Sequence, residues 1–252
     1  ILTYLNLSGS DQTVELNSDV LVNIDLNQVF HLHNTTEQKV TVVYKKLPKE
    51  LISDVNSILE IDESDKVLSH ELFQGGDKEA YNMSTDIFVV DTPFLIAKLE
   101  EEAAKEEPRK LRYVLRDLAV AENAFAYEYT GYLSNIHSVK AYFDANLDML
   151  ESHKFYKLFA PNQKVYTKVK NEEPTYYSDS SEVKLSQFAS GSIVRGKVEN
   201  SVISRNVDLS EGSSVSHSIL FPRVKVAKGA TVEYAIVDKG VKIADGVTIR
   251  GT

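Results

Sequence analysis

The sequence predicts two domains of different class: an α/β domain over residues 1–150 and a β-solenoid over residues 182–252, joined by a linker over residues 151–181. Two observations carry this prediction. Apolar residues and glycines recur with a fixed period of 17 between Ser192 and Thr252. Before residue 150, by contrast, strand-like alternation and helix-like spacing follow one another along the chain. A length of 252 residues accommodates two domains.

The elements of the α/β domain follow in order. Apolar alternation predicts strands at Gln12–Leu16, Val20–Ile24, Lys39–Tyr44, Ser57–Ile61, Val67–Leu72, Met83–Val90 and Ala124–Tyr129. Helical spacing predicts helices at Leu26–His33, Thr92–Lys105, Leu111–Leu118 and 138–150. The strand–helix–strand order over residues 20–44 implies parallel pairing of its two strands, and the turn at Asp62–Asp65 implies a hairpin.

Two of these helices have recognisable starts. Thr92 followed by Pro93 predicts an N-cap and a proline in the first helical position. Ser138 is predicted to cap the last helix, whose apolar stripe we expect to pack against the sheet. The stripe consists of Val139, Phe143, Leu147 and Leu150.

The solenoid is predicted from ladders of apolar residues. Because each coil can bury its β-branched side chains only on its neighbours, a period this short indicates stacked β-coils. Within a coil the ladder positions 209, 215, 220 and 226 step by six, five and six, which predicts three short faces per coil and a triangular prism of parallel strands. The ladders are Val198, Val215, Val232, Ile249; Leu209, Val226, Ile243; Ile203, Leu220, Val237; and Val207, Val224, Val241.

One apolar row falls outside these ladders. Val202, Ile219 and Ile236 each precede an inward residue by one position, so strand alternation places all three on the outside of the solenoid. A continuous apolar stripe on a surface indicates a contact. We therefore expect this stripe to be an interface with the α/β domain or with another subunit.

Composition excludes several classes of partner. The net charge of −9 gives no basic footprint for nucleic acid. No apolar run approaches the roughly 20 residues of a membrane span, and no signal peptide opens the chain. The absence of cysteine fits a cytoplasmic protein. Because the chain starts at Ile1 and not at Met, we expect it to be an N-terminally truncated fragment.

Several stretches resemble one known family. The segment Gly131–Ser138 and the helix after it resemble the Gly-Tyr-Trp-x-Asp-Val-Gly-Thr segment and following helix of bacterial glucose-1-phosphate adenylyltransferases. Asn17–Asp19 followed by Asn23–Asp25 resembles that family's Ser-Gly-Asp-His strand end, and the C-terminal repeat is similar to its left-handed β-helix of hexapeptide type. The resemblance implies that residues 1–150 are part of a Rossmann-like, mixed-sheet nucleotidyltransferase domain, and that the family's glycine-rich nucleotide loop would precede Ile1.

The resemblance also implies which residues would stand in the active site. In the family two aspartates bind Mg²⁺; Asp19 matches the first, but the second falls on Asn135, whose amide offers only a neutral oxygen. The sugar-phosphate lysine falls on Phe73 and the site tryptophan on Leu133. Each change removes a charge or a polar contact. The resemblance thus implies a GlgD-type regulatory subunit, catalytically weak or inactive, with no metal ligands of its own.

Its implied partner is the catalytic glucose-1-phosphate adenylyltransferase subunit, which would use Mg²⁺ and ATP to make ADP-glucose for glycogen. Together they would form a heterotetramer, with a homo-oligomer as the alternative. Two other functions are weighed against this one. The full-length protein could be an active sugar-phosphate nucleotidyltransferase, or the solenoid could be an acyltransferase with His217 as general base.

Two small clusters have weaker interpretations. His31 and His33 stand two apart, as in a strand-borne metal pair, but no third ligand lies nearby and packing or surface roles are favoured. Lys45, Lys46 and Lys49 could bind a phosphate effector, although a solubilising loop is the favoured reading.

Overall fold

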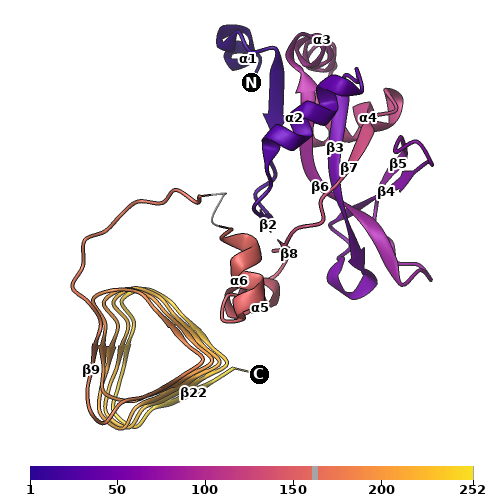
Figure 1. Cartoon of the computed structure of the whole chain (residues 1–252). Coiled ribbons are helices and arrows are strands. Elements are labelled where there is room, and N and C mark those ends of the chain that lie inside the picture. Colours follow the sequence, from indigo (N-terminus) through magenta and orange to yellow (C-terminus); the bar gives the residue numbers. More distant parts are fainter. Residues whose placement is uncertain (161–163, 252) are drawn as a thin grey trace. The chain divides into compact units, whose positions relative to one another are not determined.

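The protein is described here by a computed structural model that covers residues 1–160 and 164–251 (Figure 1). The chain divides into two compact units, Ile1–His137 and Ser138–Thr252. The helix that the sequence analysis assigned to the end of the α/β domain therefore belongs to the second unit, and the predicted boundary at residue 150 falls inside that unit.

The first unit is the α/β domain. Its helices are α1 (Leu2–Ser8), α2 (Leu26–Thr35), the 3₁₀ turn η1 (Lys49–Leu51), α3 (Thr92–Ala103) and α4 (Leu111–Ala121). Its strands are β1 (Gln12–Glu15), β2 (Val20–Val22), β3 (Val40–Pro48), β4 (Ser57–Ile61), β5 (Val67–Leu72), β6 (Ala80–Asp91), β7 (Phe125–Glu128) and β8 (Leu133–Asn135).

The main sheet of this unit is mixed. Its order is β5-β4-β6-β3-β7, with β1 also paired to β6. Strand β3 runs antiparallel to β6 and parallel to β7. The predicted parallel pairing across residues 20–44 is wrong, because β2 instead pairs antiparallel with β8 in a separate two-stranded sheet. The predicted hairpin is confirmed, since β4 and β5 pair antiparallel.

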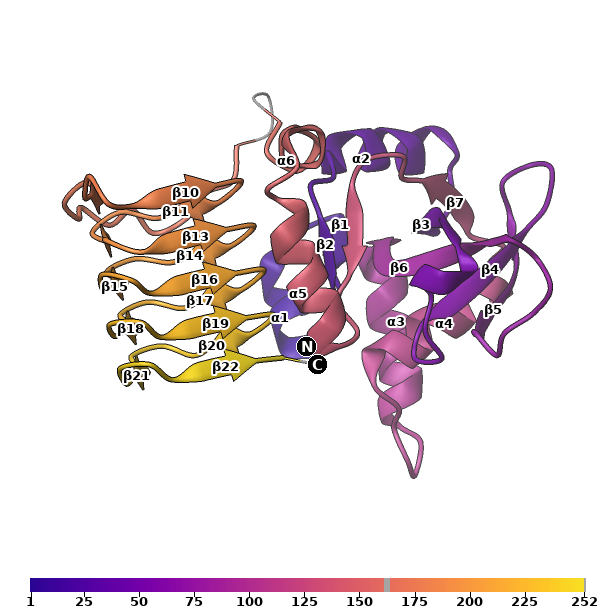
Figure 2. The same cartoon turned by 90° about the horizontal axis from the view of Figure 1, so that it is seen from below.

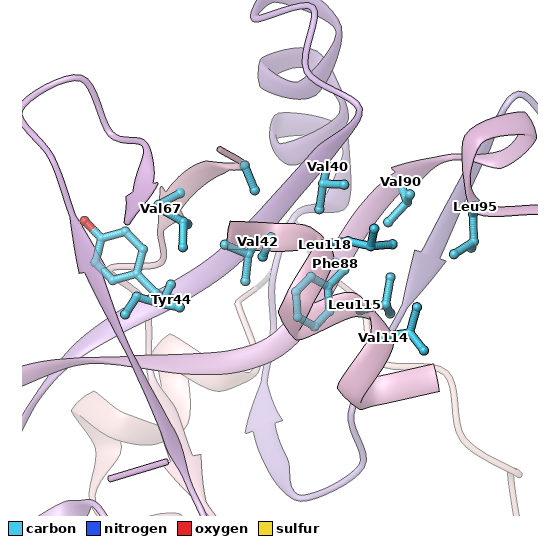
Figure 3. Packing of buried hydrophobic residues seen from close by; sticks show 14 of the residues in the cluster. Val40, Val42, Tyr44, Val67, Phe88, Val90, Leu95, Val114, Leu115 and Leu118 are labelled. Atoms are coloured by element: carbon cyan, nitrogen blue, oxygen red, sulfur yellow. The ribbon is translucent and has the colours of Figure 1, made fainter. Parts of the chain in front are cut away.

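The principal core of the unit lies between this sheet and the helices α3 and α4. Figure 3 shows Val42 and Phe88 from the sheet beside Leu115 and Leu118 of α4. Phe88 and Leu115 are fully buried. Helix α4 has apolar residues three and four apart, so one face reaches the sheet, while Tyr113 and Asp117 of the same helix are exposed.

The outer edge of β7 is covered by the hairpin. The backbone N–H of Val67 donates to the carbonyl of Ala124 at 3.0 Å, and the N–H of Ala126 donates to the carbonyl of Asp65 at 2.8 Å. Lys66 and Phe125 form an antiparallel bridge between these two bonds. The start of β5 thus returns to β7, and the sheet closes on itself at this point.

The predicted helix caps are half right. Ser138 Oγ accepts a hydrogen bond from the N–H of Ala141 at 3.1 Å, which confirms the cap of the helix that follows. The N-cap of α3 is Asp91 and not Thr92, and its side chain makes no capping bond. The Thr92 hydroxyl lies 2.8 Å from the hydroxyl of Thr13 on β1, so it is engaged with the neighbouring strand.

The second unit contains two helices and the solenoid. The helices are α5 (Val139–Asp148) and α6 (Ser152–Leu158). One face of the solenoid consists of β10 (Glu182–Lys184), β13 (Lys197–Glu199), β16 (Ser214–Ser216), β19 (Thr231–Glu233) and β22 (Thr248–Arg250). The second consists of β11 (Gln187–Phe188), β14 (Val202–Ile203), β17 (Ile219–Leu220) and β20 (Ile236–Val237). The third consists of β9 (Tyr176–Tyr177), β12 (Ile193–Val194), β15 (Asp208–Leu209), β18 (Lys225–Val226) and β21 (Lys242–Ile243).

The solenoid is the predicted triangular prism of parallel strands. Figure 1 looks along it and shows the three faces, and Figure 2 shows the coils stacked from β10 to β22. Val198 pairs with Val215 and Val215 with Val232, which is the predicted spacing of 17. Val183 pairs with Val198, so the first coil is two residues shorter. Strand β9 extends the solenoid into the predicted linker.

The ladder residues fill the interior of the prism. Val198, Val215, Val226 and Val232 are almost wholly buried. Val241, predicted to point inward, is 38% exposed, because no described coil stacks beyond the one that carries it. A further ladder uses serine: the N–H of Ser218 donates to Ser201 Oγ and the N–H of Ala235 donates to Ser218 Oγ, both at 3.1 Å. Each hydroxyl thereby satisfies a backbone group of the next coil.

Candidate functional site

The four positions that the sequence analysis placed in a degenerate active site lie in one region. The pairing of β2 with β8 sets Val20 opposite Asn135, and the N–H of Ile136 donates to the backbone carbonyl of Asp19 at 2.7 Å. Phe73 and Leu133 pack in one apolar cluster with Val20. Positions 19, 73, 133 and 135 therefore converge, although they come from three separate parts of the chain.

The side chain of Asn135 is buried and committed to other protein groups. Its Nδ2 donates to Asn56 Oδ1 at 2.7 Å and to the carbonyl of Leu51 at 3.3 Å. Its Oδ1 accepts from Asn56 Nδ2 at 3.2 Å. Asn56 is itself fixed, since its Oδ1 also accepts from the N–H and the hydroxyl of Ser53 at 2.9 Å. The two amides form a reciprocal pair that holds the loop before β4 against β8.

This arrangement does not fit a magnesium site built on positions 19 and 135. Mg²⁺ is bound through carboxylate oxygens in near-octahedral geometry. The oxygen of Asn135 is neutral and already accepts a hydrogen bond, and its nitrogen cannot bind a cation. Within residues 1–160 and 164–251, no group of three or more His, Cys, Asp or Glu side chains is arranged to hold a metal ion.

Phe73 occupies its position as a core residue. It is 6% exposed, and its ring packs edge-on against that of Tyr81 with centroids 5.1 Å apart. Leu47, Ile52 and Met83 complete the buried part of this cluster, against which Leu133 packs. An apolar cluster offers no charge to a phosphate, and a lysine placed at position 73 would bury its ammonium group among aliphatic side chains.

A buried polar cluster lies elsewhere on the sheet and was not predicted. Arg116 of α4 donates to both carboxylate oxygens of Asp86, at 3.1 and 2.6 Å, and both side chains are nearly inaccessible. Asp86 has φ 51°, where the register of β6 against β3 shifts. His70 Nε2 lies 3.8 Å from Asp86 Oδ1 and 2.9 Å from Ser57 Oγ. The one sequence signal for this cluster was an aspartate directly before the apolar run of residues 87–90 in a predicted strand.

Burial sets the ionisation of this cluster. Desolvation lowers the pKa of His70 to about 4, against an opposing contribution from Asp86. Desolvation also raises the pKa of Glu15 on β1, and Asp86 raises it further. The cluster joins α4 to the sheet with one buried ion pair and a neutral histidine. Its side chains are buried, which indicates a structural role.

The two histidines and three lysines that the sequence analysis considered as binding residues lie in different surroundings. His33 is buried, with Nδ1 at 2.8 Å from Thr41 Oγ1 and Nε2 at 3.2 Å from Asp91 Oδ1, whereas His31 is exposed. His33 therefore joins α2 to β3 and β6. Lys45 Nζ donates to the carbonyl of Gly131 at 2.8 Å. Lys49 Nζ donates to the carbonyl of Gly76 at 2.5 Å, and Lys46 lines a pocket with Gly76, so Lys45 is bonded to a different loop from Lys49.

His217 lies in a row of corner residues on the solenoid. Its Nε2 is 3.2 Å from Asn200 Nδ2, and its ring stacks on that of Tyr234 with centroids 4.7 Å apart. These are the residues one coil back and one coil on, and all three have positive φ. A histidine bonded and stacked in this way is part of the ladder of side chains along the corner.

The outward stripe faces helix α5. Ile219 is 1% exposed, and Val202 and Ile236 are half-buried. The ring of Tyr142 on α5 lies edge-on to that of Phe221, with centroids 6.5 Å apart. Ile236 also lines a groove with Val139 and Phe143 of α5. Part of the stripe is therefore covered within its own unit, and its role between subunits stays a prediction.

Comparison with known proteins adds to this geometry. Residues 171–251 match the family described as GlmU-like, C-terminal hexapeptide. The chain is 27% identical to the glycogen biosynthesis protein GlgD of Bacillus subtilis (strain 168), over 85% of this chain and 52% of that protein. It is 27% identical to the glucose-1-phosphate adenylyltransferase of Geobacillus stearothermophilus, over 85% of this chain and 56% of that protein.

A third relative is the glucose-1-phosphate adenylyltransferase of Thermosipho africanus (strain TCF52B), at 25% identity over 81% of this chain and 50% of that protein. The chain spans about half the length of these curated relatives. No helix within the described residues is long and apolar enough to cross a membrane. The similarity extends across both units and confirms the resemblance seen in the sequence, which is to glucose-1-phosphate adenylyltransferases and GlgD.

Proposed function

We propose that the chain is part of a regulatory subunit of glucose-1-phosphate adenylyltransferase, catalytically weak or inactive, that supports ADP-glucose synthesis for glycogen. The observation that carries the proposal is the state of position 135. Where the family resemblance places a metal-binding aspartate, this chain has a buried amide bonded to Asn56 and to the Leu51 carbonyl. The Asn135 side chain could bind a metal ion only if it gave up its hydrogen bonds to Asn56 and Leu51, which hold the loop before β4 against β8.

Position 73 supports the same proposal. Nucleotidyl transfer needs positive charge near the sugar phosphate, because charge accumulates on the phosphoryl oxygens in the transition state. Phe73 is buried in an apolar cluster and supplies none. Loss of a single positioned group of this kind typically reduces turnover by about 10²–10³-fold.

The proposal includes a partner, a compartment and an assembly. A catalytic adenylyltransferase subunit would bind Mg²⁺ and ATP, and this subunit would need no cofactor of its own. The solenoid is the candidate contact in a cytoplasmic heterotetramer, through its outward stripe of Val202, Ile219 and Ile236. In that stripe Val202 and Ile236 are half-buried and Ile219 is already covered within its own unit. A homo-oligomer through the same surface is the alternative.

The test uses the full-length protein, alone and together with the catalytic subunit of the same organism. ADP-glucose formation from glucose 1-phosphate, ATP and Mg²⁺ is measured for each protein and for the mixture. We expect the full-length protein alone to be slower than the catalytic subunit by at least about 10²-fold. We also expect the mixture to differ from the catalytic subunit in rate or in response to effectors.

The opposite result has a clear meaning. Turnover by the full-length protein alone that approaches that of the catalytic subunit would establish an active nucleotidyltransferase and overturn the proposal. A mixture that neither co-purifies nor changes the kinetics of the catalytic subunit would remove the regulatory role.

A further inference from the structure

Strand β6 has a gap in its pairing along one edge. On this edge β1 pairs with residues 88–91 and β4 pairs with residues 82–83. Residues 84–87 lie between them and pair with neither strand in the described part of the chain. The opposite edge is irregular at the same place, because the register against β3 shifts there and passes over Asp86. A bulge of this kind re-aims a side chain, and here it turns the carboxylate of Asp86 toward α4.

The backbone of Asp86 has a conformation that suits glycine. Its φ of 51° lies in the left-handed region, where a Cβ is disfavoured. The residue also places a carboxylate at a site that is only 4% exposed. A buried carboxylate paired with an arginine adds little net stability compared with apolar residues of similar volume. Stability alone therefore does not account for an aspartate at this position.

The contacts of this carboxylate are those of a bound carboxylate ligand. Arg116 Nε and Nη2 donate to its two oxygens at 3.1 and 2.6 Å, which is the two-point geometry with which arginine binds a carboxylate. The Ser84 hydroxyl donates to Asp86 Oδ1 at 3.4 Å. His70 Nε2 lies 3.8 Å from the same oxygen. The gap thus has the donors of an anion site, and the anion belongs to the chain itself.

Two polar atoms in this cluster are left unsatisfied. Glu15 Oε2 and His70 Nδ1 are buried and have no hydrogen-bond partner among the described residues. Burial raises the pKa of Glu15 and lowers that of His70 to about 4, and the charge of Asp86 raises both. Native networks seldom leave buried polar atoms unpaired. The two atoms therefore indicate room for a polar group beyond those that the chain supplies.

We propose that Asp86, besides joining α4 to the sheet, is an internal ligand: its carboxylate occupies an anion site formed by Arg116 and Ser84 in the gap of β6, and keeps that site closed. The ligand that this site would take in its place is a small carboxylate, which matches the arginine fork and the hydroxyl. The proposal rests on the proposed function in one respect. Since β1 leads to Asp19 and β5 leads to Phe73, Asp86 neutralises an arginine that would otherwise attract an anionic substrate toward the degenerate positions.

The experiment removes the internal ligand and supplies it from solution. In Asp86→Gly the backbone suits the new residue, and Arg116 loses its carboxylate. Sodium formate and sodium acetate are titrated into the chain by calorimetry, with sodium chloride at equal ionic strength as the salt control. Asp208→Gly is the matched control, because it removes the carboxylate partner of Arg195 from an ion pair that is open to solvent.

We expect formate or acetate to bind Asp86→Gly saturably with a Kd of about 1–10 mM, which a ligand of three or four heavy atoms can reach. The parent chain and Asp208→Gly should bind either anion at least about tenfold more weakly. Asp86→Gly/Arg116→Met should lose the binding, because the arginine fork is gone. Circular dichroism with and without formate follows folding, and an Asp86→Gly chain that folds only with formate gives the same result by another readout.

Three results would overturn the proposal. Asp86→Gly binds neither carboxylate up to about 100 mM, or stays unfolded at that concentration. Asp208→Gly or the parent chain binds formate as tightly as Asp86→Gly does. The double variant keeps the affinity of Asp86→Gly. None of these results concerns ADP-glucose formation by the full-length protein, so the proposed function would stand without the internal ligand, and rapid turnover would overturn the proposed function while leaving the binding result intact.

Discussion

Replacing Asn135 by Asp tests the structural role of this residue directly. The substitution changes one nitrogen to oxygen and restores the carboxylate that the family resemblance places here. In the structure, that nitrogen donates to Asn56 Oδ1 and to the Leu51 carbonyl. A carboxylate would set oxygen against oxygen at both contacts, and Asn56 cannot turn without losing its bonds to Ser53.

The expected cost follows from these contacts. Two hydrogen bonds of about 0.5–1.5 kcal/mol each are lost, and a charge is placed in a site that is 7% exposed. Together these give a destabilisation of about 2–4 kcal/mol at pH 7. Burial raises the pKa of the new carboxyl above its value in the unfolded chain. The part of the penalty that comes from charge is therefore present at pH 7 and shrinks as the pH falls through that raised pKa.

The assay is urea unfolding of the chain at pH 7 and pH 5, followed by circular dichroism. Asn34→Asp is the matched control, because Asn34 is exposed and accepts a hydrogen bond from Gln12 that a carboxylate can also accept. We expect Asn34→Asp to lie within about 0.5 kcal/mol of the parent chain. An Asn135→Asp chain as stable as the control at pH 7 would refute the reasoning, and Asn135 would then be an unconstrained position.

Three further outcomes are expected from the same unfolding measurement. Ser218→Ala should lower the free energy of unfolding by about 1–3 kcal/mol, because the N–H of Ala235 loses its acceptor. Ser214→Ala, on the outer side of the same coil, should change it little. Equal effects of the two substitutions would contradict the serine ladder. Because burial lowers the pKa of His70 to about 4, the unfolded chain takes up the proton first, and stability should fall by about 3 kcal/mol between pH 6.5 and 4. His70→Phe should remove that part of the slope, and an unchanged slope would assign it to other groups. Ile219→Asp should lower the free energy of unfolding by about 3–5 kcal/mol or change the assembly state, because the Ile219 side chain is only 1% exposed. An unchanged free energy of unfolding together with an unchanged assembly state would contradict the burial of Ile219.

The sequence was most informative where one physical rule determined the structure. In the solenoid each coil can pack only on its neighbours, so the spacing of 17 residues fixed the register, the three faces and the buried ladders. The hairpin of β4 and β5 was likewise predictable, because the turn residues Asp62–Asp65 lie between two short runs with strand-like alternation. Both features depend on local sequence alone.

The sequence was less informative where distant segments compete for one strand. The sequence predicts a strand at residues 20–24 that pairs parallel with residues 39–44. In the structure β2 pairs instead with β8, which lies more than a hundred residues further along the chain. In the same way, the amide of Asn135 could be seen as an altered ligand, but its partner Asn56 could not be foreseen. The Asp86–Arg116 pair could not be foreseen either, because its two residues lie on a strand and a helix 30 residues apart in the sequence.

The closure of the main sheet has a consequence for its motions. A strand at the end of an open sheet can detach by breaking one row of hydrogen bonds, and its amide protons then exchange quickly with solvent. Strand β7 is held by β3 on one side and by residues 65–67 on the other. Detaching it requires both rows to break together. The amide protons of Val67 and Ala126 should therefore exchange as slowly as those of the central strands β3 and β6, and only when the whole sheet opens.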